Sequence, residues 1–162
     1  MGQYEEILSA LVDADVDFIL GGGVACVLHG VERVTMDVDV AVATDPANFA
    51  KFLSVMESLG LKPRVPIDPR SLLDPGVMDH IIHEKQALVF SFLDPDLPTR
   101  QVDMFLRRDL SHQAMAGHVE TVDFRGKSLK IVSKRKLLDI KLAIDPPRAK
   151  DQIDIEFLRK NV

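Results

Sequence analysis

The chain has little cysteine, no long apolar segment and no excess of basic residues, and each absence excludes a class of protein. Cys26 is the single cysteine, so no disulfide can form within the chain. Charged residues interrupt every apolar run before it reaches the roughly 20 residues that a membrane-spanning helix requires. We therefore expect a protein without internal disulfides and without a membrane partner.

The charge distribution gives a second set of exclusions. The N-terminal residues are acidic where a secretory signal peptide has a basic region, which favours a cytoplasmic location. A formal net charge of -5 argues against a broadly basic nucleic-acid-binding protein. Two basic groups, at 107–108 and 134–136, are typical of a solvated surface. If they border a cleft, they would guide an RNA end or a triphosphate.

Length and composition fit one folded unit. Of 162 residues, 46% are hydrophobic and 28% are charged, which suffices for one hydrophobic core. No internal repeat, low-complexity segment or linker divides the chain. We expect a single domain over residues 1–162.

Hydrophobic periodicity predicts alternating helices and strands. Helices are expected at 5–13, 24–30, 46–60, 133–144 and 150–160. Strands are expected at 16–20, 36–42, 87–93, 100–106, 119–124 and 128–132. The range 62–76 is expected to be irregular, and 77–84 fits a helix or a strand equally. This order predicts an α/β (α+β) fold, with a mixed sheet, helices mainly on one side, and a short C-terminal helical pair.

A glycine turn follows the first expected strand. Gly21, Gly22 and Gly23 lead into a short apolar helix that ends at Gly30. Backbone N–H groups of Gly22 and Gly23 can approach an anion without obstruction by side chains, and the start of a helix favours negative charge. The alternative is a tight strand-to-helix turn without a ligand.

Two aspartates alternate with valines in the second expected strand. Asp37 and Asp39 would lie on the same face of this strand, where their like charges repel each other. The pattern therefore indicates a counter-ion, and Mg²⁺ prefers carboxylate oxygens together with substrate phosphates. The alternative interpretation is a solvated strand edge or the start of a turn.

A third carboxylate lies in a later apolar strand. Asp103 stands between Val102 and Met104, and a third ligand would allow two metal ions about 4 Å apart. In such a site one metal activates an attacking hydroxyl and the other stabilises the triphosphate and its leaving group. Asp103 would then assist deprotonation of the hydroxyl.

Other polar residues have structural interpretations that we favour. His29 can contact a phosphate, but hydrogen bonding at a helix end is the commoner role. Cys26 lies among apolar neighbours and is expected to be an inert buried thiol. His80, His83 and Glu84 lack the spacing of a zinc motif, so we do not assign zinc to them.

These motifs resemble the signature of the polymerase-beta-like nucleotidyltransferase superfamily. More narrowly, they resemble its small bacterial and archaeal branch, which includes the minimal nucleotidyltransferases and the AbiEii-type toxins. The residues concerned are Gly22-Gly23-Val24-Ala25, His29-Gly30, Arg33, Thr35, Asp37-Val38-Asp39, Val102-Asp103-Met104, the run 139–143, Arg148-Ala149-Lys150-Asp151 and Asp154. One difference is Gly23, because many members have a serine there whose hydroxyl contacts a phosphate.

The resemblance implies roles for individual residues. The implied catalytic and metal-binding residues are Asp37, Asp39 and Asp103, which would hold two Mg²⁺ ions, or Mn²⁺ in their place. The implied nucleotide-binding residues are Gly22, Gly23, Arg33, Thr35 and Lys141.

The expected activity is Mg-dependent transfer of a nucleoside monophosphate from a nucleoside triphosphate, such as ATP, to a hydroxyl. The acceptor is an RNA end or a protein, as in toxin-antitoxin relatives, or a small molecule such as an aminoglycoside. A short chain leaves the cleft open, which favours a homodimer or a partner protein that covers it. The alternative is a non-catalytic nucleotide-binding or regulatory module that retains the fold.

Overall fold

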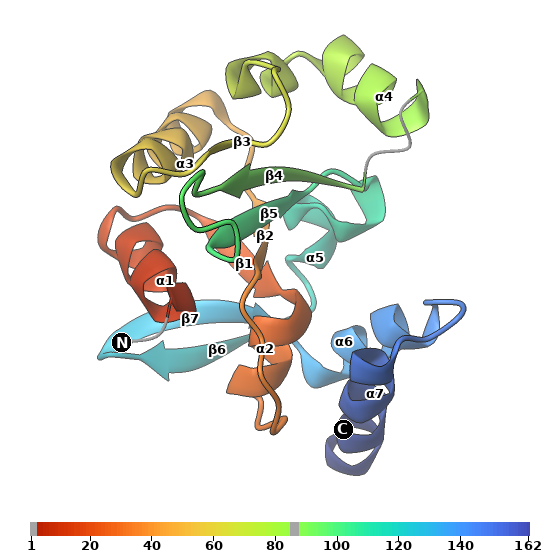
Figure 1. The fold of residues 1–162 in the computed structure, drawn as a ribbon. Helices are drawn as coiled ribbons and strands as arrows, with labels where there is room; N and C mark the ends of the chain where they lie inside the picture. The colour runs from red at the N-terminus through yellow and green to blue at the C-terminus, as the bar shows by residue number, and fades with distance from the viewer. Residues whose placement is uncertain (1–2, 85–87) are drawn as a thin grey trace.

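A mixed sheet organises the chain, for which the computed structural model describes residues 3–84 and 88–162. Within these residues the sheet has seven strands in the order β3-β4-β5-β2-β1-β7-β6 (Figure 1). Their bounds are β1 (Phe18–Gly21), β2 (Val38–Val42), β3 (Lys62–Pro63), β4 (Val89–Leu93), β5 (Gln101–Phe105), β6 (Val119–Phe124) and β7 (Lys127–Val132). The β1–β7 and β2–β5 pairs are parallel, and the other neighbouring pairs are antiparallel. The expected mixed sheet is thus confirmed.

Helices flank this sheet and complete the α/β class expected from the sequence. Their bounds are α1 (Gln3–Asp13), α2 (Gly22–Leu28), α3 (Pro46–Ser58), α4 (Pro75–Glu84), α5 (His112–Met115), α6 (Lys134–Leu142) and α7 (Ala149–Asn161), with 3-10 turns at Pro69–Leu73 and Arg108–Leu110. The ambiguous range 77–84 is helical. The helix α5 was not predicted, because four residues are too few for a periodic pattern. The expected start of the 87–93 strand, Ala87, lies outside the described residues.

The hydrophobic core includes an aromatic cluster between α3 and the β4–β5 side of the sheet. Phe49 and Phe52 of α3 are fully buried, and Phe52 meets Phe92 of β4 edge to face with ring centroids 5.6 Å apart. The ring centroids of Phe90 and Phe92, both on β4, are 5.3 Å apart. Offset and edge-to-face contacts of this kind add to the stabilisation from apolar burial. The cluster packs α3 against β4, which pairs in turn with β5, the strand that carries Asp103.

The strand β2 begins later than the sequence predicts. Alternation suggested a start at Met36, but the first residue of the strand is Val38, and Asp37 precedes it. The neighbouring β1 ends at Gly21, the register partner of Asp39, because the chain turns there into α2. Asp37 therefore has no partner in β1 and lies exposed at the start of the strand.

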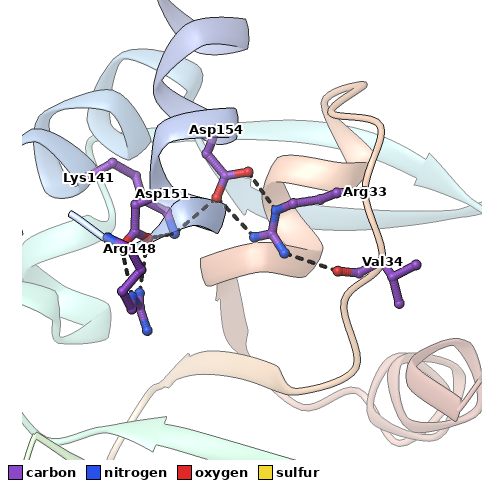
Figure 2. A network of polar contacts seen from close by, with 6 residues as sticks. All are labelled: Arg33, Val34, Lys141, Arg148, Asp151 and Asp154. Atoms are coloured by element: carbon purple, nitrogen blue, oxygen red, sulfur yellow. Dashed lines mark hydrogen bonds and ion pairs between the residues drawn. The ribbon is translucent and has the colours of Figure 1, made fainter.

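The C-terminal helical pair is present as expected, and a buried network of ion pairs joins it to the rest of the protein (Figure 2). Lys141 of α6 contacts both Asp151 and Asp154 of α7, at 2.9 and 3.1 Å. Asp154 also accepts two hydrogen bonds from Arg33, at 2.7 and 2.9 Å. Arg33 lies in the segment between α2 and β2, so the network connects the last helix to the segment that carries Asp37.

Both aspartates of this network are fully buried, yet both are held in the ionised form. Burial alone would raise the pKa of Asp151, but hydrogen bonds from Arg148 and Lys141 outweigh it and lower the pKa. Burial likewise acts against Asp154, and hydrogen bonds from Arg33 and Lys141 lower its pKa below the usual value. The cations therefore compensate the desolvation of the two carboxylates.

Removing Asp154 should destabilise the protein strongly. Asp154→Ala leaves the buried Arg33 and Lys141 without their shared carboxylate, and breaking a buried pair costs about 3–5 kcal/mol of unfolding free energy at pH 7. Glu156→Ala, on the exposed side of the same helix, should change it by less than about 1 kcal/mol. Urea unfolding of both variants measures the difference.

The same comparison has a defined pH dependence. The pKa of Asp154 is lower in the folded protein than in the unfolded chain. Its contribution to the free energy of unfolding is therefore fully present above the unfolded-state pKa of about 3.9 and declines as pH falls further. The stability gap between wild type and Asp154→Ala should therefore shrink below about pH 4. Equal losses for Asp154→Ala and Glu156→Ala at pH 7 would contradict this account.

Candidate active site

Two aspartates lie side by side on the central parallel pair of strands. Asp39 of β2 and Asp103 of β5 are register partners, so their side chains leave the same face of the sheet on adjacent strands. Adjacent strands are about 4.8 Å apart, which places the two carboxylates within mutual electrostatic reach. Asp37, two residues before Asp39, adds a third carboxylate at the start of β2.

Two neutral side chains orient Asp103. Its Oδ1 accepts a hydrogen bond of 2.6 Å from the Ser91 hydroxyl and one of 2.7 Å from the Gln101 amide. Ser91 is the register partner of Asp103 on β4, and Gln101 precedes it by two residues on the same strand. Sequence reasoning missed both residues. The i, i+2 spacing of Gln101 was a usable signal, whereas Ser91 required knowledge of the strand register.

The glycine turn lies directly against the acidic residues. Gly22 has a φ of 60°, and a Cβ there would lie 1.9 Å from Oδ2 of Asp39. A Cβ at Gly23 would lie 2.6 Å from the Thr35 hydroxyl and 2.7 Å from Nη2 of Arg33. A side chain at position 23 would therefore collide with Thr35 and Arg33 unless these two side chains moved.

All eight residues predicted from the sequence come together around one cleft of about 1040 Å³. They are Gly22, Gly23, Arg33, Thr35, Asp37, Asp39, Asp103 and Lys141. Further lining comes from the end of β5, from α6 and from the loop before α7. The structure thus brings together residues that are more than 100 positions apart in the chain.

The two basic residues among these eight are both engaged in ion pairs within the protein. Arg33 donates to Asp154, and Lys141 contacts Asp151 and Asp154. Their side chains are 9% and 7% exposed, respectively. Their charge contributes to the potential of the cleft, while their hydrogen bonds hold the C-terminal helices.

The carboxylates perturb one another strongly. Burial raises the pKa of Asp39 to about 7, with further contributions from the negative charges of Asp103 and Asp37. Partial desolvation and the negative charge of Asp103 also raise the pKa of Asp37, and the positive charges of Lys150 and Arg64 act in the opposite direction. The repulsion inferred from the sequence is therefore present, and a cation at this position would relieve it.

This donor set fits a hard divalent cation. Within residues 3–84 and 88–162, no three acidic, histidine or cysteine side chains are grouped closely enough to form a complete metal site. Mg²⁺ does not need such a site, because it is usually bound through one or two carboxylates together with substrate phosphates and water. Asp37, Asp39 and Asp103 supply oxygen ligands only, which matches the preference of Mg²⁺ or Mn²⁺.

Two other residues have the structural roles expected from the sequence. His29, at the end of α2, contacts the Val132 carbonyl through Nε2 at 2.8 Å. Cys26 is fully buried, and burial together with the charge of Asp154 raises the pKa of its thiol to about 12. Neither residue lines the cleft.

Replacement of Gly22 tests the contact between the turn and Asp39. Gly22→Ala should cost about 3 kcal/mol of unfolding free energy or more, because the new Cβ is strained by its positive φ and collides with Asp39. Gly60→Ala is the matched control, since Gly60 has a φ of 73° and no atom within 4 Å of its Cβ position. Its cost should be about 1–2 kcal/mol. Equal costs in chemical unfolding would show that Asp39 does not lie against the turn.

Comparison with known proteins relates this architecture to solved structures only. No protein-family model and no curated protein matches the chain. The lincosamide antibiotic adenylyltransferase LnuA, solved with lincomycin bound, is similar with a TM-score of 0.64 and 14% identity, over 99% of this chain and 96% of that one. The antibiotic-resistance factor ANT(2'')-Ia is similar with a TM-score of 0.62 and 16% identity, over 98% and 82%.

A third similar structure is described as a nucleotidyltransferase from Helicobacter pylori. It matches with a TM-score of 0.53 and 18% identity, over 97% of this chain and 67% of that one. At these identities the similarity establishes the architecture alone. The chain therefore has the nucleotidyltransferase fold.

Proposed function

We propose that the protein transfers a nucleoside monophosphate from a nucleoside triphosphate to a hydroxyl acceptor, with Mg²⁺ held by Asp37, Asp39 and Asp103. The observation that carries the proposal is the pairing of Asp39 with Asp103 across β2 and β5, directly against the glycine turn. The turn places backbone N–H groups beside the carboxylates, where a phosphate bridged to a metal would lie. The nucleotidyltransferase fold supports the same reaction.

The reaction exchanges one phosphorus–oxygen bond for another. The acceptor oxygen forms a bond to the α-phosphorus, the bond from that phosphorus to the bridging β-oxygen breaks, and its electron pair leaves with pyrophosphate. Asp103, oriented by Ser91 and Gln101, accepts the proton of the hydroxyl. Asp37 and Asp39 would hold the metal beside the triphosphate. Bound Mg²⁺ would lower the pKa of the hydroxyl and neutralise charge on the phosphates.

A small molecule is the acceptor that the cleft supports best. The cleft volume of about 1040 Å³ is at the upper end of the range for small-ligand sites, which leaves room for two ligands. Val34, Met36 and Leu88 line it and expose 81%, 47% and 59% of their surface, which offers apolar contacts at the entrance. An RNA end or a protein hydroxyl, as in toxin-antitoxin systems, are the alternative acceptors.

Nucleotide and metal binding can be tested by thermal shift. Each ribonucleoside triphosphate is titrated with and without Mg²⁺ against wild type and an Asp37→Asn, Asp39→Asn double variant. A ligand at 100 times its dissociation constant stabilises the folded protein by about 2.7 kcal/mol. We expect Mg-dependent stabilisation in wild type and none in the double variant.

A control separates the site from a general loss of charge. Asp123→Asn removes an exposed carboxylate on β6 and should respond to nucleotide as wild type does. If no triphosphate stabilises wild type in the presence of Mg²⁺, the alternative of a non-catalytic module is favoured instead.

Asp39 should weaken the fold when no metal is bound. Its pKa is about 7 in the folded protein and about 3.9 when unfolded, so the folded state binds more protons between these values and stability falls as pH rises through this window. Asp39→Asn should therefore stabilise the metal-free protein by about 2–4 kcal/mol at pH 8, and by little at pH 4. Urea unfolding in EDTA measures this difference. A variant less stable than wild type at pH 8 would contradict the inferred repulsion.

A further inference from the structure

We propose that Arg64 binds an anionic group of a small-molecule acceptor, so that the acceptor carries a phosphate or a carboxylate near the hydroxyl that receives the nucleotide. The inference rests on the function proposed above and specifies the acceptor that this function leaves open. Arg64 directly follows β3 and lies outside the motifs by which the sequence resembles the nucleotidyltransferases. Its place in the sheet is what identifies it.

Arg64 belongs to a row of residues that crosses the sheet through the acidic site. Its backbone N–H donates to the Ser91 carbonyl at 2.9 Å, which continues the β3–β4 register by one residue. Ser91 pairs with Asp103, Asp103 pairs with Asp39, and Asp39 pairs with Gly21. Residues directly opposite each other on neighbouring strands project from the same face of a sheet. Arg64 therefore lies on the face that carries the carboxylates of Asp39 and Asp103.

The order of this row favours the acceptor over the triphosphate as the ligand of Arg64. Gly21 leads into the glycine turn, where the nucleotide phosphates are proposed to lie, and Arg64 is at the other end of the row, beside β4. At about 4.8 Å per strand, the backbones of these two residues are about 19 Å apart, whereas Arg64 is about 10 Å from Asp103. An acceptor whose hydroxyl reaches Asp103 from this side has its remaining groups beside Arg64.

The basic residues that line the cleft come from other elements. They are Arg33, Arg107, Lys136, Lys141, Arg148 and Lys150. Four of the six are held in ion pairs with aspartates. They belong to the segment before β2, the end of β5, α6 and the start of α7, and Figure 1 shows α6 and α7 on the side of the sheet away from β3. Arg64 does not line the cleft itself, so it would meet the part of the acceptor that extends beyond Asp103.

The guanidinium group of Arg64 is available to a ligand. Within the described part of the chain its side chain has no hydrogen-bond or ion-pair partner, and the residue is exposed. Its charge nevertheless reaches the site, because desolvation and Asp103 raise the pKa of Asp37 whereas Lys150 and Arg64 lower it. Lys62, exposed two residues earlier, adds positive charge on the same face of β3.

This arrangement selects for one sign of charge on the acceptor. A planar guanidinium group can donate two parallel hydrogen bonds to a carboxylate or a phosphate. An ammonium group of an acceptor at the same position would be repelled by Arg64 and Lys62. The β3 side of the site is therefore suited to an anionic acceptor and unsuited to a polyamine.

The test compares an anionic probe with its neutral counterpart, because the natural acceptor is unidentified. Glycerol phosphate and glycerol are titrated separately into isotopically labelled protein, observed by NMR, with Mg²⁺ and a saturating non-hydrolysable nucleoside triphosphate. The bound nucleotide then occupies the glycine turn. We expect glycerol phosphate to shift the backbone amide signals of Arg64 and Ser91, and glycerol to bind at least about tenfold more weakly.

Two arginine variants separate recognition by Arg64 from a general effect of charge. Arg64→Gln should weaken the binding of glycerol phosphate by about tenfold, because a charge-assisted hydrogen bond is lost. Arg70→Gln is the matched control, since the Arg70 side chain is 72% exposed on the 3-10 turn that follows β3 and does not line the cleft. It should bind glycerol phosphate as wild type does. Circular dichroism melting checks that both variants fold.

An RNA trinucleotide tests the other source of the same chemistry, because its phosphodiester groups are also anionic. We expect it to bind no more tightly than glycerol phosphate. Tighter binding that is lost in Arg64→Gln would overturn the small-molecule acceptor in favour of an RNA end.

The outcomes separate this inference from the proposed function, and the titrations are repeated without nucleotide for that purpose. If wild type binds the Mg-nucleotide but glycerol phosphate binds equally to Arg64→Gln and Arg70→Gln, or shifts only Gly22 and Gly23, the inference is wrong and the function stands. If glycerol phosphate binds at Arg64 but no nucleoside triphosphate binds, the anion site stands and the function is wrong. Failure of wild type to bind either ligand would overturn both.

Discussion

The repulsion among three carboxylates at one edge of two parallel strands is the constraint on which the site depends. Asp39 and Asp103 are forced together by the β2–β5 register, and burial raises the energetic cost of the charge on Asp39. Gly22 lies so close to Asp39 that no side chain fits between them. The fold thus maintains an arrangement that is unfavourable without a cation, which is a common property of functional sites.

Basic residues from the C-terminal part of the chain offset the repulsion among these carboxylates. The C-terminal helices bring Arg148, Lys150 and Lys141 to the cleft opposite the carboxylates. Asp151 and Asp154 join the two helices through Lys141. Asp154 also pairs with Arg33, which belongs to the segment that leads to Asp37. Because breaking a buried ion pair is costly, these pairs fix the position of the C-terminal basic residues relative to the acidic residues.

The sequence predicts the parts of this site better than their connections. Asp39 and Asp103 were found because single charges stand out in apolar strands of period two, and the glycine turn was found because it interrupts the pattern. The start of β2 was misplaced, since alternation does not show where a neighbouring strand ends. The Arg33–Asp154 pair joins positions 121 apart, and no local pattern reveals a contact of that separation. For the same reason the Ser91 hydrogen bond to Asp103 required the register of β4 and β5.

The most direct test of the central claim is crystallography of the protein with Mn²⁺ and a non-hydrolysable nucleoside triphosphate, using anomalous scattering to locate the metal. The account predicts anomalous peaks coordinated by carboxylate oxygens of Asp37, Asp39 and Asp103, with the phosphates beside Gly22 and Gly23. Metal density elsewhere, or a nucleotide bound away from the β2–β5 carboxylates, would contradict it.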